Sequence, residues 1–263
     1  MHTGRHGGVG ARSLARVLDR GSEHHSEAEI ADELDGRGAS LSVMAGRHQT
    51  TISATCLAED FETIFALVAD VALRPLFDPR EVETRRAELL TAILQDEDDP
   101  AAVSVDVVMS RLYPDHQYGR RPRGTQQTVE RITRNDLHWF TPEGTTVVVV
   151  GDVDAGDVMR AARRAFDAWS VPRSSEPTLR AIPPASERRR EIVSMMNKAQ
   201  TDIAYALVGL RRSDPAYYPG WVMNNALGQY ALGGRLGDSI RERQGMAYYV
   251  YSTLDASLAE GPL

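Results

Sequence analysis

Residues 234–254 read GRLGDSIRERQGMAYYVYSTL and join a helical pattern to an extended one through a glycine. Apolar and charged positions at helical spacing predict a short helix over Arg235–Arg243. Gly245 then interrupts the pattern, as glycine commonly does beyond the end of a helix. The β-branched and aromatic run that follows predicts a strand over Ala247–Leu254. The unit is therefore helix, glycine, strand.

The same order of elements occurs 207 residues earlier in the chain. That shift places Gly21 on Gly228, Gly38 on Gly245 and Val43 on Val250. Each copy then predicts a helix, a glycine-containing loop, a short helix, a glycine and a strand. Three identities alone are compatible with chance, and the matching order of elements favours a duplication. Both interpretations stay open at this point.

The rest of the chain alternates helices with short strands. Ser26 with Glu29 forms a capping box that opens a helix through Leu34. Further helices are predicted over 61–71, 78–95, 101–112 and 153–169, a short one after Thr133, and one over 214–227. Strands are predicted over 39–45, 49–57, 145–150, 192–196 and 201–210.

A proline-rich change in composition divides the sequence. Pro172, Pro177, Pro183 and Pro184 occur among Ser, Glu and Arg residues and are typical of a linker. We therefore expect a first α+β domain over 1–170, a linker over 171–191 and a second α+β domain over 192–263. The second domain stops just after a predicted strand and is expected to be incomplete.

Composition excludes several classes of function. The chain of 263 residues has a net charge of −7, which argues against nucleic-acid binding. No apolar run approaches the roughly 20 residues of a membrane helix. No nucleotide-binding or nucleophile-elbow motif is present. The first ten residues have no apolar signal core, so we expect a cytoplasmic protein, or a periplasmic one if an N-terminal signal has been lost.

Three features need a structural explanation. His24 and His25 stand among glutamates, but adjacent histidines on a helix cannot face one ion, and we interpret them as a solvated loop before the Ser26 cap. Cys56, the only cysteine, lies in an apolar alternating stretch and is interpreted as a buried, unreactive thiol. His116 lies in the stretch YPDHQYG (113–119) and is expected to be structural.

Many short stretches, in order, resemble the insulinase/pitrilysin family of zinc peptidases, which includes mitochondrial processing peptidase. The stretches are LDRGSE (18–23), GASL (38–41), RPLF (74–77), DDP (98–100), YPDHQYG (113–119), GT (124–125), VVGDVD (149–154), FDAW (166–169), GRL (234–236) and RERQGMAY (241–248). The resemblance spans nearly the whole chain. It implies a clamshell half of two homologous α+β domains, each a mainly antiparallel sheet backed by helices, whose N-terminal strands are missing here.

The resemblance also shows what this chain lacks. The family's catalytic half carries His-x-x-Glu-His on a helix, with a further glutamate downstream, to hold zinc and a general base. The corresponding positions here are Arg12, Ser13, Leu14, Ala15 and Arg16, and downstream Thr91 and Ala92. Arginine stays protonated and cannot ligate zinc. The resemblance therefore implies a non-catalytic half with no metal or cofactor of its own, zinc being held by a partner half.

Arg241 and Tyr248, seven residues apart, match the Arg/Tyr pair that the family's non-catalytic half offers to substrate. The resemblance implies that Tyr248 donates to the oxyanion formed from the peptide carbonyl and that Arg241 grips substrate carbonyls. Spacing alone favours a plain interpretation, an exposed arginine on a helix and an aromatic residue on a strand.

Three functions compete. The first is a non-catalytic half or partner subunit of a zinc metalloendopeptidase, inactive alone, whose partners are a zinc-bearing half and a peptide substrate. The second is a structural scaffold subunit of a larger complex without peptidase chemistry. The third is an independent peptide-binding protein.

Overall fold

The computed structural model describes residues 17–137, 145–169, 179–182, 187–230 and 233–263. The chain forms two compact units, the first of Met1–Gln95 with Arg121–Glu176 and the second of Asp96–Arg120 with Pro177–Leu263. The change to the second unit after Glu176 falls within the predicted linker. The helical segment Asp96–Arg120 precedes that linker and belongs to the second unit. The expected domain limits at 170 and 192 stay a prediction.

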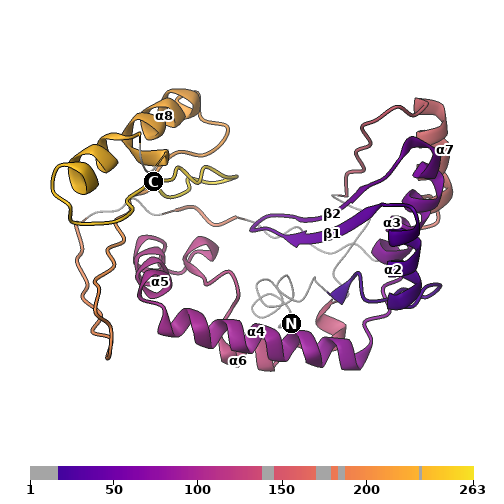
Figure 1. Ribbon diagram of the computed structural model, residues 1–263, viewed down its shortest axis with the longest axis horizontal. Coiled ribbons are helices and arrows are strands. Elements are labelled where there is room, and N and C mark those ends of the chain that lie inside the picture. The colour runs from indigo at the N-terminus through magenta and orange to yellow at the C-terminus, as the bar shows by residue number, and fades with distance from the viewer. Residues whose placement is uncertain (1–16, 138–144, 170–178, 183–186, 231–232) are drawn as a thin grey trace. The chain divides into compact units, whose positions relative to one another are not determined.

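The first unit is a two-stranded antiparallel hairpin with helices beside it (Figure 1). Strands β1 (Ser40–Ala45) and β2 (Thr50–Thr55) pair in a register that places Val43 opposite Ile52. Helix α2 (Glu27–Gly36) contacts β1, while α3 (Phe61–Leu73) contacts β2 and α7 (Ala155–Phe166). The other elements are the short helix α6 (Gln126–Glu130) and the 3-10 turns η2 (Ala58–Asp60) and η4 (Arg134–Leu137).

Local sequence signals set the ends of these helices. The Ser26 side chain and Glu29 form both hydrogen bonds of the predicted capping box at α2. Asp154 accepts from two backbone amides at the start of α7. Thr133 donates to the Asp136 carboxylate across the turn at η4, with its amide at 2.8 Å.

The core of the first unit is a single apolar cluster. Its buried members come from most elements of that unit: Val17, Leu18, Ile30, Val43, Leu67, Val71, Phe77, Val82, Ile132 and Leu137. Burying such side chains is the main favourable term in folding. Leu34 and Leu41 pack against this cluster.

The long helix α4 (Pro79–Asp98) begins after the Asp78 cap in the first unit and continues past its limit at Gln95. The second unit then contains α5 (Pro100–Leu112), the turn η3 (Gln117–Gly119), α8 (Tyr217–Asn224) and two π-helical turns, η5 (Asn225–Gln229) and η6 (Gly237–Glu242).

The strands predicted over 145–150, 192–196, 201–210 and 247–254 are not strands in the described part of the chain, where β1 and β2 are the paired ones. An isolated antiparallel bridge joins Val208 to Pro262. A strand requires a hydrogen-bonded partner strand. Alternation of apolar and polar residues predicts which side chains share a face, but it does not identify that partner. The predicted α+β class, helices with an antiparallel sheet, is confirmed, and the sheet of the described residues has two strands.

Candidate functional site

The predicted Arg/Tyr pair lies on the helical turn η6 and the segment after it. Gly245 has a φ of +61°, in the left-handed region, and its amide donates to the Arg241 carbonyl at 3.0 Å. The Met246 amide donates to the Ile240 carbonyl, also at 3.0 Å. These bonds end the helix in a left-handed glycine cap and turn the chain back toward it.

This turn brings Arg241 and Tyr248 together. The guanidinium carbon of Arg241 lies 5.3 Å from the centroid of the Tyr248 ring, within the range of a cation–π interaction. The Tyr248 side chain is 85% exposed, and the Arg241 side chain is 31% exposed. Arg241 Nε also lies 3.7 Å from a Glu242 carboxylate oxygen. The phenol and the guanidinium thus offer neighbouring hydrogen-bond donors to a molecule arriving from solvent.

The first unit contains the same local frame with different residues in it. Gly38 has a φ of +59° and follows α2, as Gly245 follows η6. The residue four before Gly38 is Leu34, and the residue three after it is Leu41. Both leucines pack against the apolar core. Where one frame packs two leucines inward, the other presents Arg241 and Tyr248, so the frame itself does not require a polar pair.

The positions expected to lack zinc ligands are only partly described. Residues 12–16 lie outside the described residues. Thr91 and Ala92 lie in α4, and the Thr91 hydroxyl donates to the Ala87 carbonyl at 2.9 Å. Alanine has no donor atom for a metal, so these two side chains do not fit a zinc site. Across the described ranges, no three or more His, Cys, Asp or Glu side chains are grouped as a metal site would require.

His24 and His25 do more than contact solvent. Their Nδ1 atoms lie 2.8 and 3.1 Å from the two carboxylate oxygens of Asp70, a buried residue of α3. The Ser22 hydroxyl and, at 2.9 Å, the Arg74 guanidinium donate to the same carboxylate. The predicted loop before the Ser26 cap is confirmed, and both histidine side chains are partly open to solvent. In addition, the Asp70 carboxylate from α3 binds both rings.

Burial of Asp70 alone would raise the pKa of its carboxyl group. The four hydrogen bonds outweigh burial and hold that pKa far below its usual range. A backbone bridge between Ser22 and Pro75 runs beside them. Asp70 thus fastens the stretch 20–25 to the end of α3, which is a structural role. A carboxylate within the apolar run 61–73 was the available signal in the sequence.

The stretch 113–119 is a packed aromatic cluster, as expected for His116. Tyr113, His116 and Tyr118 are all buried, and the His116 and Tyr118 rings meet edge to face at 4.7 Å. The Tyr118 amide donates to His116 Nδ1 at 3.1 Å, so Nε2 carries the proton and donates to the Arg180 carbonyl at 3.0 Å. A Cβ added to Gly119 would lie 2.4 Å from the Tyr113 carbonyl oxygen.

Cys56 is half-buried. The prediction of a fully buried thiol is therefore wrong. Partial burial, together with the nearby Asp60 carboxylate, still raises the pKa of the Cys56 thiol, which lowers its reactivity.

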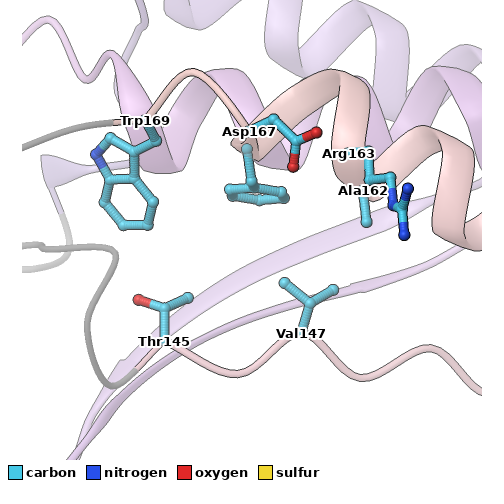
Figure 2. Close-up of a pocket in the computed structure, with 7 residues that line it drawn as sticks. Thr145, Val147, Ala162, Arg163, Asp167 and Trp169 are labelled. Atoms are coloured by element: carbon cyan, nitrogen blue, oxygen red, sulfur yellow. The ribbon is translucent and has the colours of Figure 1, made fainter.

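A shallow pocket of about 230 Å³ lies in the first unit between α7 and the segment before it. Figure 2 shows Thr145 and Val147 pointing toward α7, which carries Ala162 and Arg163, and toward the turn at Asp167 just after its end. Its lining is mainly apolar, without a nucleophile–base pair. No helix in the described ranges is long and apolar enough to span a bilayer.

Comparison with protein families gives two adjoining matches. The model described as insulinase, peptidase family M16, matches residues 11–126, and the model described as the peptidase M16 inactive domain matches residues 128–263. Together they cover almost the whole chain.

Individual relatives agree with these matches. An uncharacterized zinc protease of Mycobacterium leprae is 30% identical over 96% of this chain and 58% of its own length. An uncharacterized zinc protease of Streptomyces coelicolor is 27% identical over 91% of this chain and 54% of its own length. The mitochondrial-processing peptidase subunit beta of Saccharomyces cerevisiae is 25% identical over 79% of this chain and 46% of its own length. The chain thus spans less than two thirds of each relative.

Two solved structures share the fold. The crystal structure of a peptidase M16 inactive domain from Pseudomonas fluorescens has a TM-score of 0.81 at 23% identity. That of a protease from Helicobacter pylori has a TM-score of 0.85 at 14% identity. Each comparison covers 99% of this chain and 64% of the other.

Proposed function

This chain belongs to the insulinase (M16) family of peptidases, and we propose that it is the non-catalytic half, or a non-catalytic partner subunit, of a zinc metalloendopeptidase. Zinc belongs to the partner half in this proposal, and this chain supplies part of the substrate chamber. The supporting observation is the pair of half-buried Arg241 and exposed Tyr248, in a frame that elsewhere packs two leucines against the core.

The chemistry assigned to the pair follows from its donors. When a peptide carbonyl is attacked, its oxygen becomes an oxyanion, and a phenol hydrogen aimed at that oxygen stabilises the transition state more than the ground state. Tyr248 carries that hydrogen. Arg241 beside it donates to substrate carbonyls and keeps the peptide in register.

Other exposed side chains fit a partner surface. Ile203 and Met196 of the second unit are 88% and 86% exposed. Apolar groups displayed in this way are typical of protein contacts. They equally fit the alternative function, a structural scaffold subunit without peptidase chemistry. The Arg241–Tyr248 pair, with its exposed phenol, favours the peptidase role over the scaffold.

The test uses the assembled enzyme. The chain is combined with a family half that carries His-x-x-Glu-His, and hydrolysis of a quenched fluorescent peptide library is followed. The proposal requires hydrolysis by the mixture and none by this chain alone. An assembled, active enzyme that is indifferent to both Arg241→Ala and Tyr248→Phe would favour the scaffold function.

A further inference from the structure

The glycine between the two proposed substrate-binding residues is held in a conformation that other residues avoid. The φ of Gly245 is +61°, where a Cβ is unfavourable. A Cβ added at Gly245 would meet no atom within 4 Å. Glycine is therefore favoured at position 245 because of its positive φ, and not because a larger side chain would lack space.

That conformation is joined by hydrogen bonds to the residues that form the pair. The Gly245 amide bonds to the carbonyl of Arg241 itself, at 3.0 Å. The segment leaving Gly245 reaches Tyr248 three residues later, with its ring 5.3 Å from the Arg241 guanidinium. If residue 245 returned to negative φ, the chain would leave the helix in another direction and the two side chains would separate.

We infer that Gly245 is a positioning residue, whose left-handed cap sets the distance between the Arg241 guanidinium and the Tyr248 phenol. The use of the pair in substrate binding rests on the proposed function. The distance between the two side chains does not, because it can be measured in the chain alone. It predicts that residue 245 acts through its φ angle and not through side-chain volume.

The chain contains a matched control. Gly38 has a φ of +59°, and a Cβ there also meets no atom within 4 Å. It also follows the end of a helix, α2, although its amide bonds to the Asp35 carbonyl three residues back and the Ala39 amide bonds to the Leu34 carbonyl. Gly38→Ala therefore imposes the same backbone strain as Gly245→Ala in the other unit. Asn tolerates the left-handed region, so Gly245→Asn is the rescuing variant.

The experiment measures the effect of the Tyr248 ring on Arg241 by NMR. In the full chain labelled with ¹⁵N-arginine, the Arg241 Nε–H signal is assigned by its loss in Arg241→Lys. The ring-current contribution is the shift of that signal between the chain and Tyr248→Leu. We expect Gly245→Ala to reduce this contribution at least twofold, Gly245→Asn to restore most of it, and Gly38→Ala to leave it unchanged.

Two results would overturn the inference. One is an undiminished ring-current contribution of Tyr248 to the Arg241 signal in Gly245→Ala. The other is a loss of that contribution in folded Gly245→Asn as large as in Gly245→Ala. Should Gly245→Ala give no folded protein, Gly245→Asn decides alone, since retention supports the inference and loss contradicts it. Activity is not part of this measurement. If the shifts behave as expected while Arg241→Ala and Tyr248→Phe both leave an assembled enzyme fully active, the substrate role proposed for the pair fails and the positioning role of Gly245 stands.

Discussion

The guanidinium carbon of Arg241 lies 5.3 Å from the centroid of the Tyr248 ring, although the two residues stand on opposite sides of a left-handed glycine turn. The ring is 85% exposed, so its packing contributes little to stability. Changes to its phenol are therefore expected to affect substrate turnover and not folding.

Replacing Tyr248 by Phe removes one hydrogen-bond donor and keeps the ring. In the enzyme assembled with a zinc-bearing half, we expect kcat to fall on the order of 100-fold, the usual effect of losing one oxyanion donor. Tyr249→Phe is the control, because Tyr249 is exposed and adjacent. Steady-state hydrolysis of one peptide compares the two variants, and equal kcat values would contradict the assignment.

Replacing Arg241 by Ala removes the proposed grip on substrate carbonyls. We expect kcat/KM to fall by about 10- to 100-fold, the range for a hydrogen bond to a charged group, mostly through a higher KM. Arg241→Lys should recover part of this loss, because lysine keeps the charge but not the planar fork. Arg243→Ala, with an exposed side chain paired to Asp238, is the matched control. A loss of the same size in that control would remove the special role of Arg241.

Replacing Asp70 by Asn tests the anchor between the stretch 20–25 and α3. We expect the free energy of unfolding at neutral pH to fall by about 2 kcal/mol, because hydrogen bonds to a charged acceptor are lost. The folded state lowers the pKa of Asp70, so its stabilisation is complete above the unfolded pKa of about 3.9 and is lost as pH falls below it. Urea unfolding at several acidic pH values should show that the free energy of unfolding falls less steeply with decreasing pH in Asp70→Asn than in the unmodified chain. The same dependence on pH in both proteins would refute the anchoring role of Asp70.

Replacing Gly119 by Ala tests the aromatic cluster at 113–119. The new Cβ would lie 2.4 Å from a backbone oxygen of Tyr113, so we expect a loss of about 2 kcal/mol or more in the free energy of unfolding. Gly36→Ala, at the end of α2, meets no atom within 4 Å and should be neutral or slightly stabilising. Chemical unfolding of both variants gives the comparison. Equal stabilities would show that residue 119 is not closely packed.

The helices could be predicted from the sequence because their signals are local. The Ser26–Glu29 capping box and the Asp154 cap lie within a few residues of the backbone amides they bind. The hairpin β1–β2 was also predictable, because its strands are separated by a short turn around Gly46.

Features that depend on distant partners could not be predicted in this way. The Ser22 hydroxyl reaches Asp70 across 48 residues, and nothing near either position announces the other. The alternation of residues 201–210 and 247–254 gave no pairing partner, and neither segment is a strand in the described ranges. Arg241 and Tyr248 were predictable as residues from the family resemblance, whereas their closeness and the exposure of the ring required the structure.

The central claim is that this chain contributes to peptide hydrolysis without holding the metal. The most direct measurement is the zinc content of the purified chain, by mass spectrometry, together with its hydrolysis of a peptide library with and without a zinc-bearing half. We predict zinc far below one ion per chain and no hydrolysis alone, with hydrolysis after the partner is added. One zinc ion per chain, together with peptide digestion in the absence of any partner, would contradict the account.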